Sequence, residues 1–185
     1  MGTLLPGDVV VVRTADLFGE AIRITEKIQH KPDMRNHVAI LHHIDYAAGV
    51  NWYLEGRPGG VGWHPFKSFA DQYQDSKWTV DNSAQPKTLA QRQAVCASML
   101  RLFGAPYDWG AIDEDAASAL RLPDVWDQWD GTMPGHVVCS SAASWAYREA
   151  QLAAPEIGGG RFTEPGDWDG FIERQGWRPG ARASW

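Results

Sequence analysis

Residues 137 to 147 read Val137-Val138-Cys139-Ser140-Ser141-Ala142-Ala143-Ser144-Trp145-Ala146-Tyr147. Small side chains recur at helical spacing in this stretch, which predicts a helix packed closely against a sheet. Cys139 falls at the start of that helix, where the partial positive charge of a helix N-terminus lowers the pKa of a thiol from about 8.5 and raises its thiolate fraction. The stretch therefore predicts a packing element and a candidate nucleophile together.

The residues before this helix predict a sheet. A continuous run of four valines begins at Val9, after a Pro-Gly turn, and is typical of a strand covered on both faces. Two later runs flank the turn Ala47-Ala48-Gly49 and predict a hairpin. The predicted strands span residues 9–12, 37–41, 52–55, 61–63 and 78–80.

Helical signals lie elsewhere in the chain. Thr88 is followed three residues later by Gln91, a capping-box pattern that predicts a helix from there to Gly104. The loosely periodic residues 16–29 favour a short helix, and the Pro-Gly pair at Pro165 favours a turn in the tail.

Length and charge limit the function classes. The chain has 185 residues, so we expect one domain over residues 1–185. Its net charge of −6, without a local Lys/Arg cluster, argues against nucleic acid as a partner. We find neither a transmembrane segment nor a signal peptide, because Asp8 and Arg13 interrupt the only early apolar run. We therefore expect a cytoplasmic protein, or one delivered by a phage or secretion assembly.

The remaining chemistry is that of cysteine. The chain has two cysteines and no CxxC or Cys/His spacing for zinc, and it lacks the common nucleotide, serine-hydrolase and HExxH motifs, so we expect no metal and no cofactor. Cys96 falls on the apolar face of the helix that starts near Thr88, which favours a core role. The adjacent His42 and His43 would point to opposite strand faces and make poor joint metal ligands.

His37 is the best candidate partner for Cys139. It opens the predicted strand 37–41, in which alternate residues share one face, and the small Ala39 on that face would leave room for a helix. All six histidines precede Cys139, so a Cys/His pair here runs in the order His then Cys. The alternative is that His37 and Cys139 are unrelated buried residues, since free cysteine is among the most buried residue types.

Several blocks of the chain, in order, resemble the NlpC-type peptidases and amidases of the papain-like superfamily. In particular, they resemble the circularly permuted branch, which includes YiiX-like proteins and the lecithin:retinol acyltransferases. The resembling blocks are Gly7-Asp8-Val9-Val10, Asn36-His37-Val38-Ala39-Ile40, Leu54-Glu55-Gly56, Leu102-Phe103-Gly104-Ala105-Pro106-Tyr107-Asp108-Trp109-Gly110, Val138-Cys139-Ser140 with Tyr147, and Thr163-Glu164-Pro165-Gly166-Asp167. Asn36, Ala39 and Val138 depart from the Ser, Gly and Asp that the family commonly has at these places.

The resemblance implies a cysteine hydrolase with a circularly permuted papain-like fold. That fold is of the α+β class, with a central antiparallel sheet and the Cys139 helix packed on one face. Cys139 would attack a carbonyl carbon, His37 would act as general base and then acid, and Glu55 would orient the imidazole. Tyr107 would hydrogen-bond the substrate or the developing oxyanion, together with the backbone N–H of Cys139. The alternative for Tyr107 is a purely packing role. Trp109 and Ser140 join the expected substrate-binding or oxyanion residues.

An acidic insertion at about 111–135 precedes the Cys139 helix. It carries six carboxylates between Asp113 and Asp130 and two tryptophans, Trp126 and Trp129. We expect it to form a wall or lid of the cleft, with the tryptophans contacting a sugar or aliphatic group and the carboxylates favouring a cationic substrate. A solvated surface loop is the alternative.

Three functions remain open from the sequence. The first is a peptidase or amidase that acts on a peptide or cell-wall fragment, for which a phage or secretion assembly would be the partner. The second is a lipid acyltransferase or thioesterase, as in the acyltransferases of the permuted branch. The third is a catalytically silent binding or virion module, against which the Cys139, His37 and Glu55 set argues.

Overall fold

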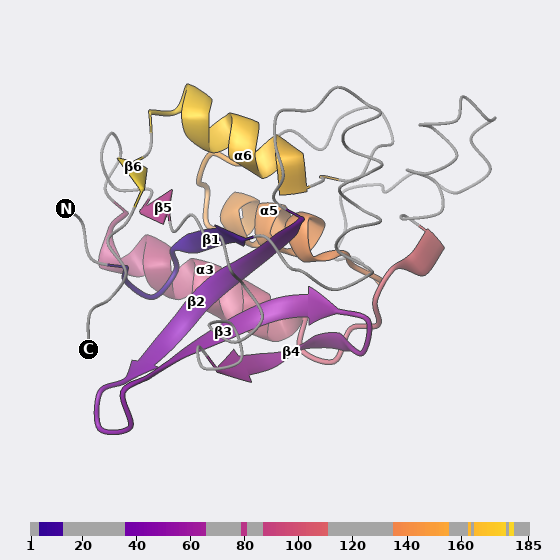
Figure 1. Cartoon of the computed structure of the whole chain (residues 1–185), viewed down its shortest axis with the longest axis horizontal. Coiled ribbons are helices and arrows are strands. Elements are labelled where there is room, and N and C mark those ends of the chain that lie inside the picture. Colours follow the sequence, from indigo (N-terminus) through magenta and orange to yellow (C-terminus); the bar gives the residue numbers. More distant parts are fainter. Residues whose placement is uncertain are drawn as a thin grey trace.

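A four-stranded antiparallel sheet organises the molecule (Figure 1). The computed structural model describes residues 4–12, 36–65, 79–80, 87–110, 135–155, 163, 165–176 and 178–179. The sheet has the order β1 (Val9–Val12), β2 (His37–Asp45), β3 (Val50–Arg57) and β4 (Gly60–Pro65). Helices α3 (Leu89–Arg101), α5 (Cys139–Glu149) and α6 (Pro165–Arg174) accompany it, and β5 (Thr79–Val80) pairs with β6 (Arg178–Pro179). The expected α+β class with an antiparallel sheet is confirmed.

Local sequence signals account for most of these elements. The four predicted strands between residues 9 and 63 are confirmed, and β2 and β3 form the expected hairpin. Of the strand predicted at 78–80, residues 79–80 form β5, which pairs with β6 outside the central sheet. The capping box forms as predicted, because the Gln91 N–H donates to Thr88 Oγ1 at 3.2 Å and the Thr88 N–H donates to Gln91 Oε1 at 2.9 Å. The helix expected at 16–29 lies outside the described residues.

One sequence expectation fails in the tail. Pro165 and Gly166, read as a turn, begin helix α6 instead. Proline suits the first position of a helix, because its missing N–H would have no intrahelical partner there and its φ is already helical. A Pro-Gly pair therefore opens a helix here, and the buried Trp168 anchors it to the core.

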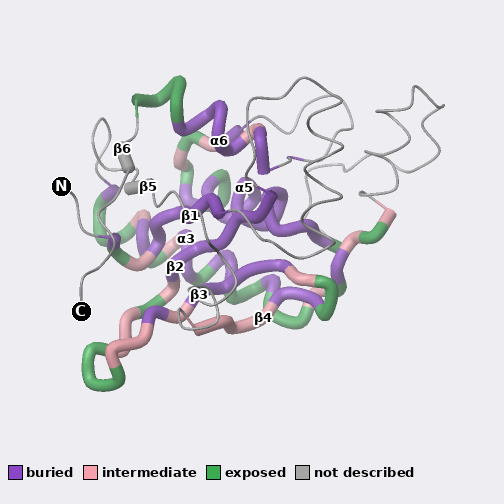
Figure 2. Tube along the Cα trace, in the orientation of Figure 1, coloured by how far each residue is buried: buried purple, intermediate pink, exposed green. Residues whose placement is uncertain are grey.

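The helices pack on one face of the sheet. Val38 and Ile40 of β2 contact the cluster that contains residues of α3, α5 and α6. Ala39 and Leu41 belong to a second buried cluster on the other face, with Val10, Val12 and Tyr53. The expectation that the small Ala39 makes room for the Cys139 helix is therefore wrong. Both faces of β1 and of the first half of β2 are buried (Figure 2).

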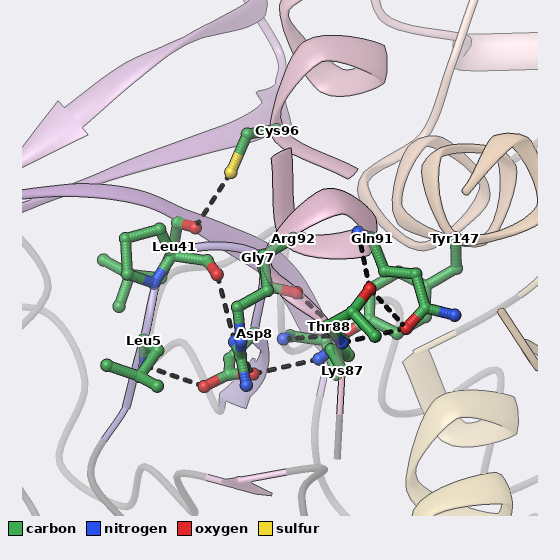
Figure 3. A network of polar contacts seen from close by, with 12 residues as sticks. Leu5, Gly7, Asp8, Leu41, Lys87, Thr88, Gln91, Arg92, Cys96 and Tyr147 are labelled. Carbon is green, nitrogen blue, oxygen red and sulfur yellow. Dashed lines mark hydrogen bonds and ion pairs between the residues drawn. The ribbon is translucent and has the colours of Figure 1, made fainter. Parts of the chain in front are cut away.

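A buried polar network fixes the turn before β1 (Figure 3). Asp8 is fully buried, and its Oδ1 accepts from Lys87 Nζ at 2.9 Å and from Arg92 Nη1 at 2.7 Å. The Tyr147 hydroxyl donates to the Gly7 carbonyl and accepts from the Val9 N–H, both at 3.1 Å. Gly7 has a φ of +87°, and a Cβ there would lie 3.0 Å from Arg92 Cα. The Gly-Asp pair thus anchors β1 to α3 and α5.

The helices within the described residues are too short or too polar to cross a membrane.

Candidate active site

Helix α5 begins at Cys139. Val138 precedes it in extended conformation, with φ −93° and ψ 164°. Valine has no side-chain acceptor for capping, and the Ser141 hydroxyl instead accepts from the Val138 N–H at 3.3 Å. Cys139 is thus the first residue of an 11-residue helix, with 2% of its surface exposed, and its own N–H has no partner within the helix.

The helix start meets β2 and β3 where the two strands diverge (Figure 1). Among the described residues, their pairing runs from Asp45–Val50 to Ile40–Leu54 and stops before His37 and Glu55. The Cys139 sulfur accepts a hydrogen bond from the Val38 backbone on β2. On β3, a Cβ at Gly56 would lie 3.3 Å from the Cys139 nitrogen, so glycine permits the close approach. Cys139 therefore contacts both strands beyond their last pair.

His37 connects Cys139 to Glu55. The His37 ring forms a side-chain hydrogen bond with Cys139, and its Nε2 lies 2.5 Å from Glu55 Oε2. His37 is 8% exposed and Glu55 is fully buried. The structure therefore brings together three predicted site residues in one continuous series of polar contacts, from α5 through β2 to β3.

Mutual charge governs the protonation of this series. Burial disfavours the His37 imidazolium, but the charges of Glu55 and Cys139 outweigh it and raise the pKa of His37 to about 10. Burial would raise the pKa of the Cys139 thiol, but the His37 charge and hydrogen bond lower it below its usual value. Burial likewise opposes ionisation of Glu55, yet His37 and Arg57 lower the pKa of its carboxyl. The opposite charges of the three groups therefore favour the thiolate of Cys139, the imidazolium of His37 and the carboxylate of Glu55 over their neutral forms.

Sequence reasoning missed two residues beside Glu55. Arg57 Nε donates to Glu55 Oε1 at 2.5 Å, and His64 Nδ1 lies 3.8 Å from the same oxygen. Burial lowers the pKa of His64, which favours its neutral form. Strand alternation was the available signal for Arg57, because residues two apart on a strand share a face. His64 comes from β4, whose pairing with β3 the sequence did not specify.

The predicted Tyr107 reaches the site region through the segment before α5. It forms a parallel bridge with Val137, two residues before Cys139, and is 6% exposed. Val137 also donates to the Pro106 carbonyl at 3.1 Å. Trp109 lies with its ring centroid 5.4 Å from that of Tyr107 and is 50% exposed. An oxyanion role for Tyr107 and a substrate role for Trp109 stay predictions.

The other predicted binding residues divide into two groups. The Ser140 hydroxyl is fully buried and donates to the Thr163 carbonyl, while the Ser140 carbonyl accepts from Trp168 Nε1 at 3.0 Å. Ser140 thereby anchors the segment before α6, and its substrate role stays a prediction. Trp126, Trp129 and residues 111–134 of the acidic insertion lie outside the described residues.

The expected regular alternation of His42 and His43 to opposite faces of β2 is disturbed. A register shift between Leu41 and His43 interrupts the alternation, and the two rings lie 5.7 Å apart. Both are near Trp63, at 4.5 and 5.4 Å between ring centroids. Within the described ranges, no group of three or more His, Cys, Asp or Glu side chains could hold a metal ion.

Known protein families and curated proteins offer no match from which the role of this site could be assigned. No protein-family model matches the sequence, and no curated protein matches it significantly.

Proposed function

We propose that this protein is a cysteine-dependent amide hydrolase with Cys139 as nucleophile, His37 as general acid and base, and Glu55 as the group that orients His37. The observation that carries the proposal is the buried hydrogen-bonded series Cys139–His37–Glu55 at the start of α5. A buried thiol that only packs in the core does not require a hydrogen bond to an imidazole that is itself bonded to a carboxylate.

The geometry supports acyl transfer in two steps. The Cys139 thiolate attacks the substrate carbonyl carbon, and the oxyanion that forms is stabilised by the Cys139 N–H. The His37 imidazolium then protonates the leaving amine as the C–N bond breaks, which leaves a thioester on Cys139. Neutral His37 next takes a proton from water, whose oxygen attacks the thioester and releases the acid and the thiolate. Glu55 keeps the ring oriented throughout.

The proposed substrate is a peptide of the bacterial cell wall, and the proposed fold is a circularly permuted papain-like one. Support comes from the ordered blocks shared with the NlpC-type family, of which the Gly7-Asp8 turn, the His37 strand and the Cys139 helix adjoin in space. The six carboxylates of the acidic insertion also favour a substrate with a free amine, such as a diamino acid.

Mass spectrometry of products tests the activity. Purified cell-wall fragments and acyl lipids are incubated with the protein, with Cys139→Ala, and with Cys96→Ala. We expect new amine and carboxyl ends in the cell-wall fragments with the parent and Cys96→Ala, and none with Cys139→Ala. Release of fatty acid alone would identify a lipid acyltransferase or thioesterase instead.

Alkylation tests the nucleophile without a known substrate. Burial raises the pKa of Cys96 to about 11, whereas His37 lowers that of Cys139, so Cys139 should react faster with iodoacetamide near neutral pH. Peptide mapping assigns the modified residue in the folded protein. Preferential modification of Cys96 would contradict the assignment of the nucleophile.

A further inference from the structure

The two oxygens of the Glu55 carboxylate have different partners. Oε2 lies 2.5 Å from His37 Nε2, and Oε1 accepts from Arg57 Nε at 2.5 Å. Glu55 is fully buried, while the Arg57 side chain that contacts it is 23% exposed. Among the described residues, Arg57 is the permanently charged group in contact with Glu55.

We propose that Arg57 is a positioning residue of this site, whose guanidinium holds one oxygen of the buried Glu55 carboxylate so that the other stays directed at His37. This inference rests on the proposed function, because it treats His37 and Cys139 as the reacting pair. Three consecutive residues at the end of β3 then have separate roles. Glu55 contacts His37, Gly56 admits the start of α5, and Arg57 holds Glu55 from the same face of the strand.

The reason lies in the mobility and charge of a buried carboxylate. A carboxylate with a single partner can rotate about its terminal torsion, which has a broad profile, and so misdirect its hydrogen bond. A second hydrogen bond to the other oxygen restricts that rotation. The guanidinium also offsets a negative charge that has no water around it, and an opposite charge within about 4–6 Å lowers a carboxyl pKa by about 1–3 units.

Other groups face Glu55 but do not replace Arg57. His37 comes from β2, Cys139 from α5, His64 from β4, and Tyr53 precedes Glu55 on the same face of β3. His64 is nearest among the remaining groups, yet it lies 3.8 Å away and burial favours its neutral form. Only the Arg57 contact combines hydrogen-bond distance with a permanent charge among these groups.

Nuclear magnetic resonance of the full chain tests the proposal. The variants are Arg57→Gln, Arg57→Lys and the matched control Arg101→Gln, which removes an exposed arginine paired with Glu149 at 2.9 Å. Two signals are followed, the titration of the Glu55 carboxyl carbon and the downfield proton of the His37–Glu55 hydrogen bond. Assignment uses Glu55→Gln.

In Arg57→Gln we expect the Glu55 midpoint to rise by about one pH unit or more, and the downfield proton to broaden and move upfield. Arg57→Lys keeps the charge without the planar donor, so its midpoint should rise less while its proton signal still changes. Arg101→Gln should match the parent. If Arg57→Gln does not fold, Arg57→Lys decides, and an unchanged proton signal in it would overturn the proposal.

Two results would overturn the role of Arg57 alone. One is the same midpoint and the same proton signal in Arg57→Gln as in the parent. The other is a raised midpoint with an unchanged proton signal, which would make Arg57 only a neighbouring charge. Failure of the proposed function has a different signature, because Cys139 of the parent would then be alkylated no faster than Cys96.

Discussion

At the scale of single residues, two thiols in one chain show how surroundings set reactivity. Cys96 lies on α3, with its sulfur 3.9 and 3.7 Å from the carbonyl oxygens of Leu41 and His42, and burial raises its pKa to about 11. Cys139 is buried at least as deeply, yet the neighbouring His37 lowers its pKa. Burial alone therefore does not activate a thiol, and a paired imidazole reverses its effect.

A prediction at this scale concerns the titration of His37. Its imidazolium should persist from acid pH until about pH 10, because Glu55 and Cys139 stabilise the charged ring. A raised pKa also means that this ion pairing stabilises the fold fully below pH 6.5 and less as the pH rises toward about 10. Glu55→Gln removes one of the two stabilising charges, so the His37 midpoint should fall by about one pH unit or more.

Proton resonances of the His37 ring, followed against pH, measure that midpoint. Glu149→Gln is the control, since it removes an exposed carboxylate of α5 that pairs with Arg101. A His37 midpoint that is equal in Glu55→Gln and in the parent would contradict the pairing of His37 with Glu55. In the proposed reaction, the same shift would bring the alkaline loss of activity to lower pH, because the leaving amine needs the His37 proton.

At the scale of elements, the end of β3 and the start of α5 determine each other's position. The helix approaches the strand at Gly56, where a Cβ would lie 3.3 Å from the Cys139 nitrogen and 3.4 Å from its Cα. Such distances are tighter than ordinary packing contacts, and the neighbour on the helix is backbone, which cannot rotate away. A side chain at this position must therefore displace the helix start that carries the nucleophile.

We therefore predict that Gly56→Ala slows the alkylation of Cys139 while the protein still folds. The added methyl should cost about 1–3 kcal/mol of stability through overpacking, partly offset by about 0.4–1 kcal/mol from a less flexible unfolded chain. Alkylation of Cys139 should slow, because a small displacement separates it from His37. Denaturant unfolding and alkylation rates measure the two effects.

Gly59→Ala is the matched control, since a Cβ there meets no atom within 4 Å and its φ lies outside the left-handed region. It should leave both quantities near those of the parent. Equal alkylation rates in Gly56→Ala and Gly59→Ala would show that the helix start does not depend on Gly56.

At the scale of the whole molecule, the Asp8 network joins parts of the chain that lie far apart in sequence (Figure 3). The turn before β1 contacts Lys87 and Arg92 of the segment around α3, and Tyr147 of α5. The same helix α5 carries Cys139 at its other end. The network therefore positions α5 against the sheet from the end opposite to the site.

Asp8→Asn should destabilise the fold strongly. It leaves the buried cations Lys87 and Arg92 without their carboxylate, and removing one partner of a buried ion pair costs about 3–5 kcal/mol. Glu149→Gln breaks the exposed pair with Arg101, whose side chains are 42% and 54% exposed, and should cost no more than about 1 kcal/mol. Urea unfolding of both variants compares the two, and similar costs would contradict a structural role for the Asp8 network.

The α+β class was implied by the family resemblance. The hairpin, the capped helix α3 and the helix that begins at Cys139 could be predicted from the residues themselves. Each depends on a signal within a short stretch, such as the periodicity of apolar residues or the spacing of Thr88 and Gln91. The pairing of His37 with Cys139 could be suggested from residue type and order, but local signals carry no information on distance between segments.

Tertiary structure alone decided the features that depend on long-range packing. Helix α5 covers the face of Val38 and Ile40 instead of that of Ala39, because both faces of β2 are apolar and alternation cannot distinguish them. The pairing of β2 with β3 stops before His37 and Glu55, and the start of α5 contacts both strands there, which places Cys139 beside His37. His64 comes near Glu55 through the register of β4 against β3. These features depend on contacts between segments that are distant in sequence, and such contacts become defined only when the whole core assembles.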